Sequence, residues 1–278
     1  MDDQKTVGSL FAGIGGFDLG FERAGFKTKW QVEINPICRA VLADRFPHAR
    51  QHEDVCTVGV AELGHVDVIV GGFPCQDVST MGARAGLAGA RTGLFWQALR
   101  IVVEVRPKWL VLENVVGLLD SNDGQDFQTV LEALASCGYV GLWRVLDSSY
   151  FGVPQRRRRV FMVAGLGQHP PIDLLSDAAP VDAVPGTIGA QQQSRPADGW
   201  AACTLLAKNA RSLIGLGCET LVAHPDARHQ MVERARMSTD AGLCTGLDET
   251  NHAEARAAGN AVTVQVAQWV AEKLIKVV

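Results

Sequence analysis

Short apolar runs alternate with amphipathic stretches along the first 165 residues of the chain. The apolar runs predict buried strands, and apolar residues at three- and four-residue spacing between them predict helices. The predicted strands are residues 6–11, 29–33, 66–70, 109–113, 142–146 and 160–164. The predicted helices are residues 17–24, 36–46, 94–105 and 126–136. Short crossovers between alternating strands and helices predict an α/β fold with a mostly parallel sheet and helices on both faces.

After residue 165 the pattern degrades into polar and proline-containing pieces without sustained periodicity. An amphipathic helix is expected again over residues 260–277. A free helix of this kind would expose its apolar face, so we expect it to pack back on the first domain. We therefore divide the chain into a first domain (1–166), a small irregular region (167–252) and a C-terminal helical segment (253–278).

Composition limits the class of protein. With 278 residues, 47% of them hydrophobic, the chain can bury the core of one large domain and a small appendage. It has no apolar run of membrane-spanning length and starts with charged residues, so we expect no membrane association and a cytoplasmic location. Seven scattered cysteines without a CxxC pair argue against a disulfide framework or a structural zinc site. A net charge of -4 disfavours a nucleic-acid partner unless positive charge is concentrated locally.

Cys75 follows the predicted strand 66–70 within the segment Gly72-Phe73-Pro74-Cys75-Gln76. The carboxyl ends of strands in an open parallel sheet face the ligand crevice, so a thiol placed there can act as a nucleophile. The alternative is a small buried cysteine that only packs at the end of a strand.

Glu113 ends the strand 109–113 and should lie on the same edge of the sheet as Cys75. Carboxylates are rarely buried without a partner, which favours a functional group over a structural ion pair. Four arginines, residues 156–159, precede the last predicted strand. Alternate residues of a strand point to opposite faces, so Arg157 and Arg159 should point the same way. A run of charges is often only a solvated face, but this one supplies the local positive charge that a polyanion requires.

The first predicted strand is followed by Phe11-Ala12-Gly13-Ile14-Gly15-Gly16, which leads into a helix. Glycines there allow a ligand to approach the backbone near a helix N-terminus, although the pattern is not GxGxxG. Glu33 ends the next strand, where a carboxylate can accept hydrogen bonds from ribose, so the pair favours an adenosine ligand. Asp54 is either an acceptor for an adenine amino group or a solvated loop residue. The spacing alone does not separate a dinucleotide from S-adenosylmethionine.

Taken in order, these motifs resemble those of the DNA (cytosine-5)-methyltransferase family. The resemblance rests on residues 11–16, 72–76, 113–115, 155–159 and 259–262. It implies a Rossmann-like S-adenosylmethionine-dependent methyltransferase fold. Residues 1–166 would then be the catalytic and cofactor-binding domain, and residues 167–252 a small target-recognition region. The C-terminal helix would pack back to complete the cofactor pocket.

The resemblance implies transfer of a methyl group from S-adenosylmethionine to C5 of a cytosine flipped out of duplex DNA. Cys75 would attack C6, Glu113 would bind N3 and the amino group, Arg157 would hold the O2 side and Arg159 would orient Glu113. No metal is implied, and we expect a monomer. The implied cofactor contacts are Phe11, Gly13, Ile14, Gly16, Glu33, Ile34, Asp54, Val55, Pro74, Leu94, Asn260 and Ala261. The implied DNA contacts are Gln76, Ser79, Arg91 and Thr204.

The recognition region departs from the family pattern. The expected Leu-Gln-Gly-Phe-Pro segment is missing from the sequence, and only residues 234–239 are loosely similar to the arginine-rich stretch before it. The target sequence therefore stays open, as does a restriction-modification, phage or orphan role. Two further hypotheses are C5 methylation of tRNA and a DNA-binding family member with weak or lost activity. A nicotinamide dehydrogenase would explain the glycine loop and Glu33, but neither the Pro-Cys nor the arginine motif.

Overall fold

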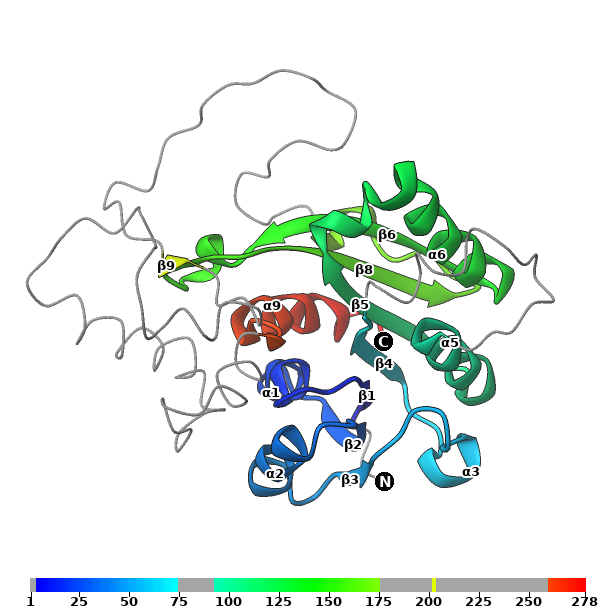
Figure 1. The fold of residues 1–278 in the computed structure, drawn as a ribbon, viewed down its shortest axis with the longest axis vertical. Helices are drawn as coiled ribbons and strands as arrows, with labels where there is room; N and C mark the ends of the chain where they lie inside the picture. Colours follow the sequence, from blue (N-terminus) through cyan, green and yellow to red (C-terminus); the bar gives the residue numbers. More distant parts are fainter. Residues whose placement is uncertain (1–3, 75–92, 176–201, 204–259) are drawn as a thin grey trace, which may run out of the picture.

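The computed structural model describes residues 4–74, 93–175, 202–203 and 260–278. Within these residues, seven strands form one sheet in the order β3-β2-β1-β4-β5-β8-β6 (Figure 1). Its strands are β1 (Thr6–Leu10), β2 (Lys27–Val32), β3 (Arg50–His52), β4 (Val68–Gly72), β5 (Trp109–Val115), β6 (Tyr139–Asp147) and β8 (Arg158–Leu166). Strands β1 to β5 are parallel, and β8 runs antiparallel between β5 and β6. A separate short pair joins β7 (Gln155–Arg156) to β9 (Ala202–Cys203).

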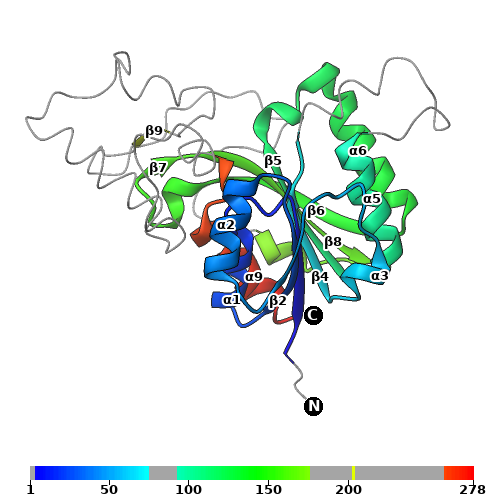
Figure 2. The same cartoon turned by 60° about the horizontal axis from the view of Figure 1, so that its bottom comes forward.

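Helices cover both faces of the sheet (Figure 2). One face carries α1 (Gly16–Arg23), α2 (Pro36–Arg45) and α9 (Val264–Leu274), and the other carries α3 (Val60–Leu63), α5 (Leu94–Val105) and α6 (Gln125–Ser136). Short 3-10 turns are η1 (Val116–Leu118), η2 (Ser121–Gly124), η3 (Ser148–Phe151) and η4 (Ile172–Leu175). The prediction of an α/β fold with a mostly parallel sheet between two helical layers is thus confirmed.

The core lies in two layers on either side of the sheet. Leu110 of β5 packs with Ile69 and Ile101 on the α5 face, whereas the next residue, Val111, packs with Val70 and Val270 on the α9 face. All six are buried. A central strand with helices on both sides needs apolar residues at every position, which explains why β5 reads as a continuous hydrophobic run.

Helix α9 packs directly on α1, which confirms that the C-terminal helix folds back on the first domain. A Cβ added at Gly20 of α1 would lie 2.7 Å from Cβ of Ala267, so glycine is what lets the two helices approach so closely. The helix is shorter than predicted, because it begins at Val264. Thr263 is extended, and its Oγ1 lies 2.7 Å from the hydroxyl of Ser148, a tertiary contact that draws the chain out of a helical path.

Other element boundaries also differ from the prediction. The short strand β3 and the one-turn helix α3 were not predicted. Three polar residues and a four-residue segment are too short to show a periodic pattern. Strand β2 begins two residues earlier, and β6 is nine residues long because it pairs with β8 along its whole length. The division of the chain at residues 166 and 252 stays a prediction.

Candidate active site

The carboxyl ends of the parallel strands are level with one another. Leu10 of β1 pairs with Gly71 of β4, and Gly72 pairs with Glu113 of β5. The residues that follow these strands therefore meet along one edge of the sheet. Phe11, Phe73 and Glu113, each from a different sequence motif, lie along this edge.

Glu113 is the buried carboxylate of this edge, with 8% of its surface exposed. Its Oε1 lies 3.0 Å from Nε of Arg159, but no donor among the described residues completes an aligned hydrogen bond to this oxygen. Burial raises the pKa of Glu113, and the nearby charges of Arg157 and Arg159 only partly oppose this. Glu113 is therefore a buried carboxyl with a tendency to hold a proton, placed beside two cationic side chains.

Arg157 is held from two directions. Its backbone N–H donates to Asp147 Oδ1 at 3.1 Å, and its Nη2 donates to the Asn260 carbonyl at 3.4 Å. Burial, together with the nearby charge of Arg159, lowers the pKa of Arg157 to about 10, while Glu113 partly opposes the change. The guanidinium therefore stays cationic at neutral pH.

The two arginines point the same way, as the sequence predicts. Arg157 and Arg159 both lie beside Glu113, while Arg156 and Arg158 are exposed. The alternation holds although Arg157 falls between β7 and β8, outside either strand.

Asn114 joins the end of β5 to the segment that precedes Cys75. Its buried Nδ2 donates to the Phe73 carbonyl at 2.9 Å, and its Oδ1 accepts from Val115 N at 2.9 Å. The described chain stops at Pro74, which is half-buried. The predicted residues Cys75, Gln76, Ser79, Arg91 and Thr204 lie outside the described residues.

The loop after β1 is held open by its backbone conformation. Phe11 has φ of 53°, an unusual value for a residue with a side chain, and Gly13 has φ of 57°. A Cβ added at Gly13 would find nothing within 4 Å, so open space lies beside the loop. The side chain of Ile14 is instead buried against Leu42 and Val264, which leaves only its backbone for a ligand.

Glu33 holds the loop after β1 through a hydrogen bond from the loop backbone. Its Oε2 accepts from Gly13 N at 2.7 Å, and its Oε1 accepts from Asn35 N at 2.8 Å. Each carboxylate oxygen can accept a second hydrogen bond, so the ribose contact implied by the sequence stays compatible with this arrangement. Ile34 beside it is 61% exposed, an apolar surface on which a flat base could lie.

Asp54 and Val55 follow β3 in a turn, in which Asp54 Oδ1 accepts from Cys56 N at 2.8 Å. The Val55 side chain is buried in the core on the α5 side of the sheet. Leu94 begins α5 and is half-buried.

The segment before α9 closes against the start of α1. A Cβ added at Gly16 would lie 2.3 Å from the Val262 carbonyl oxygen, so the space for a side chain there is already filled. Ala261 is half-buried and Asn260 is exposed. Only glycine therefore fits at position 16, where the closing segment packs against α1.

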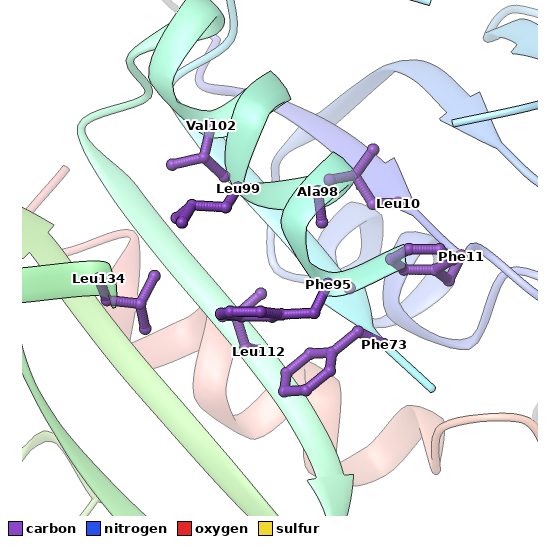
Figure 3. A pocket seen from close by; sticks show the side chains of 10 residues that line it. Leu10, Phe11, Phe73, Phe95, Ala98, Leu99, Val102, Leu112 and Leu134 are labelled. Carbon is purple, nitrogen blue, oxygen red and sulfur yellow. The ribbon is translucent and has the colours of Figure 1, made fainter. Parts of the chain in front are cut away.

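A cavity of about 20 Å³ lies behind Phe11 and Phe73, beneath α5 (Figure 3). Leu99 and Val102 of α5 and Leu112 of β5 complete an apolar lining. This volume holds roughly one water molecule, and the walls offer it almost no polar partner. The cavity is therefore a packing gap and does not correspond to the predicted cofactor site.

The residues around Gly13 do fit an adenosine-bearing cofactor. They combine open space beside a glycine loop, a carboxylate with spare acceptor capacity in Glu33 and the exposed apolar side chain of Ile34. In the part of the chain that the structure describes, no cluster of three or more histidine, cysteine, aspartate or glutamate residues could hold a metal ion. Among the same residues, no helix is long and apolar enough to cross a membrane.

Sequence reasoning missed two groups that support the site. Asp147 accepts from the backbone of both Arg157 and Ser149, and its place at the end of a predicted strand was an available signal. Arg100 contacts the turn after Asp54 from helix α5. Its spacing from Glu104 indicates only an ordinary ion pair within a helix.

Comparison with known proteins agrees with this arrangement. A family model for C-5 cytosine-specific DNA methylases matches residues 5–184. The type II methyltransferase M2.BsuMI of Bacillus subtilis (strain 168) is 30% identical over 292 residues, covering 96% of this chain and 75% of that protein. The type II methyltransferase M.Bsp6I of Bacillus sp. (strain RFL6) is 37% identical over 160 residues, or 56% of this chain and 51% of that protein. The chain thus spans about half the length of M.Bsp6I.

Among solved structures, that of a Spodoptera frugiperda DNMT2 mutant matches with a TM-score of 0.65 and 16% identity, covering 98% of this chain and all of that one. The likeness supports the methyltransferase fold expected from the motifs. The family model covers more than half of the chain, and the identity to M2.BsuMI extends over nearly all of it. The chain therefore belongs to the C-5 cytosine-specific DNA methylase family.

Proposed function

We propose that the protein transfers a methyl group from S-adenosylmethionine to C5 of a cytosine flipped out of duplex DNA. The observation that carries the proposal is Glu113, a buried carboxyl with a raised pKa at the end of β5, with Arg157 and Arg159 beside it. Cytosine presents a ring nitrogen that accepts and an amino group that donates, which a protonated carboxyl matches in both respects. The ring atoms are inaccessible within a duplex, so the base must leave the stack.

In this proposal Cys75 is the nucleophile. Its thiolate forms a bond to C6, and Glu113 donates a proton to N3 as negative charge moves onto the ring. The same carboxyl accepts a hydrogen bond from the amino group. In the sequence, Cys75 directly follows Pro74, the last described residue after β4.

The arginines hold the base and the acid. Arg157, cationic and anchored through Asp147 and Asn260, binds the O2 side of the ring. Arg159 keeps the Glu113 carboxylate oriented through the 3.0 Å ion pair. When bound, S-adenosylmethionine supplies the methyl group on a sulfonium that C5 attacks. Loss of the C5 proton to a base, departure of the Cys75 sulfur as a thiolate and return of the N3 proton to Glu113 then restore the aromatic ring.

The cofactor is proposed to lie beside the loop after β1. Gly13 gives it room, Glu33 accepts from the ribose hydroxyls, and the Ile34 side chain and the backbone of Val55 flank the adenine. The backbone of Ile14 and Gly16, with the closing residues Asn260 and Ala261, borders the same space. Phe11, Asp54, Pro74 and Leu94 complete the proposed contacts.

DNA contacts are proposed for Gln76, Ser79, Arg91 and Thr204. The relatives named above are bacterial, which supports the proposal that the protein acts on DNA in the cytoplasm. A monomer stays a prediction. We also propose that the protein belongs to a restriction-modification system, because the relatives are named type II methyltransferases.

The test is transfer of labelled methyl groups from S-adenosylmethionine to duplex DNA and, in parallel, to tRNA. We expect 5-methylcytosine in the DNA, identified by mass spectrometry of its nucleosides, and bisulfite sequencing then gives the target sequence. Label only in tRNA would replace the DNA substrate by the RNA alternative. Binding of DNA with no transfer to either nucleic acid would favour the inactive family member.

A further inference from the structure

Arg100 on helix α5 uses all three of its guanidinium nitrogens. Its Nε donates to Gln97 Oε1 and its Nη1 to Glu104 Oε1, both at 2.9 Å. Both of these acceptors belong to α5 itself. The remaining nitrogen, Nη2, leaves the helix and donates to the carbonyls of Val55 at 2.9 Å and Val58 at 2.8 Å.

The turn that Arg100 contacts is also held by its own backbone bonds, by two buried side chains and by Glu104. Within it, Cys56 N and Thr57 N bond back to Asp54, and the Val55 and Val58 side chains are buried. Glu104 adds one further bond, because its Oε2 accepts from Val60 N at 3.2 Å. Two carbonyls thus point at one rigid guanidinium fork, a match that a lysine ammonium on its flexible stem does not reproduce.

This contact connects two parts of the proposed cofactor site. Asp54 and Val55 lie on the turn, and Leu94 lies at the start of the helix that carries Arg100. We propose that Arg100 is a positioning residue for the adenine side of the cofactor site, which fixes Asp54 and Val55 relative to Leu94. The proposal rests on the cofactor assignment made above, and Arg100 itself touches no ligand in it.

The test measures binding of S-adenosylhomocysteine by calorimetry to the full chain and to the variants Arg100→Lys and Arg100→Gln. We expect both variants to bind about tenfold more weakly, since the loss of charged hydrogen bonds loosens the turn. The value of kcat at saturating S-adenosylmethionine should change less than KM. Glu104→Gln is the matched control, because it removes the charge of the ion pair, keeps a side-chain oxygen that can accept from Val60 N, and leaves the two carbonyl contacts of Arg100 in place; it should bind close to wild type.

A second ligand separates positioning from a purely structural role. S-inosylhomocysteine replaces the adenine amino group by a carbonyl, so Asp54 should disfavour it. In Arg100→Gln the preference for the adenosyl over the inosyl ligand should shrink. Unchanged affinity and preference alongside a lowered melting temperature would overturn the proposal and leave Arg100 as a stabilising residue. If the wild-type chain bound neither ligand, the cofactor assignment itself would fall, a result distinct from equal binding by wild type and variants.

Discussion

The side-chain amide of Asn114 donates to the backbone carbonyl of Phe73 at 2.9 Å, and this buried bond joins β5 to the segment that leads to Cys75. Because Glu113 is the neighbouring residue, one short stretch of β5 sets both the proposed acid and the path of the proposed nucleophile. Replacing Asn114 should therefore disturb their relative placement.

Asn114→Ala should lower kcat by about tenfold or more and destabilise the fold by about 1–3 kcal/mol, because the Phe73 carbonyl is left buried without its donor. Steady-state kinetics and urea unfolding measure the two effects. Gln128→Ala, which removes an amide on the exposed face of α6, serves as the control and should change neither. A variant with normal kcat would show that the bond is not needed to align the site.

Glu113 should produce the fall of kcat on the alkaline side of its pH profile. Burial raises its pKa, so the protonated form that donates to N3 persists above the usual range of a carboxyl and is lost as pH rises through the raised pKa. Glu113→Gln should lower kcat by about 10²–10⁴-fold and remove that alkaline fall, with little change in binding of S-adenosylhomocysteine. An unchanged alkaline fall in the glutamine variant would assign it to another group.

Cys75 should be trapped by DNA that contains 5-fluorocytosine at the target site. Fluorine cannot leave as a proton does, so the bond between the sulfur and C6 should persist through denaturing electrophoresis. Cys75→Ala should form no such complex and should still bind S-adenosylhomocysteine. Methyl transfer by the alanine variant would contradict the proposed nucleophile.

Asp18 on α1 should make stability depend on pH. It is fully buried above β1 and β2; this burial raises its pKa to about 6 from 3.8, which nearby Glu22 reinforces and Gln31 and Ser9 oppose. A folded-state pKa above the unfolded value means that this contribution is complete below about pH 4 and is lost as pH rises through about 6. His48 lies 2.7 Å from the carboxylate of the same Glu22.

Asp18→Asn removes this loss of stability. The free energy of unfolding of the variant, relative to wild type, should therefore increase by about 1–2 kcal/mol between pH 5 and pH 8. Urea unfolding at both pH values measures the difference. An equal difference at the two values would mean that Asp18 is not the group that titrates.

Gly16→Ala should destabilise the protein, because the new Cβ would lie 2.3 Å from the Val262 carbonyl oxygen. Relief requires the closing segment or α1 to move, at a cost of about 1–3 kcal/mol. The melting temperature should fall, and S-adenosylhomocysteine should bind more weakly because the displaced segment includes Ala261. Gly117→Ala is the control, as a Cβ there meets nothing within 4 Å.

Much of the fold could be predicted because apolar periodicity is a local property. β5 reads as an uninterrupted apolar run, and α5 shows its spacing so clearly that the predicted and observed bounds are the same. The edge strand β3 could not be found this way, since its pairing with β2 and not its own composition makes it a strand. The extended Thr263 likewise follows from its contact with Ser148, far away in the chain.

By itself, the sequence determined the chemical groups of this protein: a thiol and a carboxyl at the ends of two predicted strands, a pair of arginines before the last one, and a glycine loop with Glu33. Parallel strands bring such groups to one edge, so their proximity followed from the fold class. Only the tertiary structure decided that Glu113 is buried with a raised pKa, that Asp147 holds Arg157 and that Arg100 holds the turn at Val55. Burial and long-range hydrogen bonds depend on which distant segments pack together, and no local pattern of residues records that.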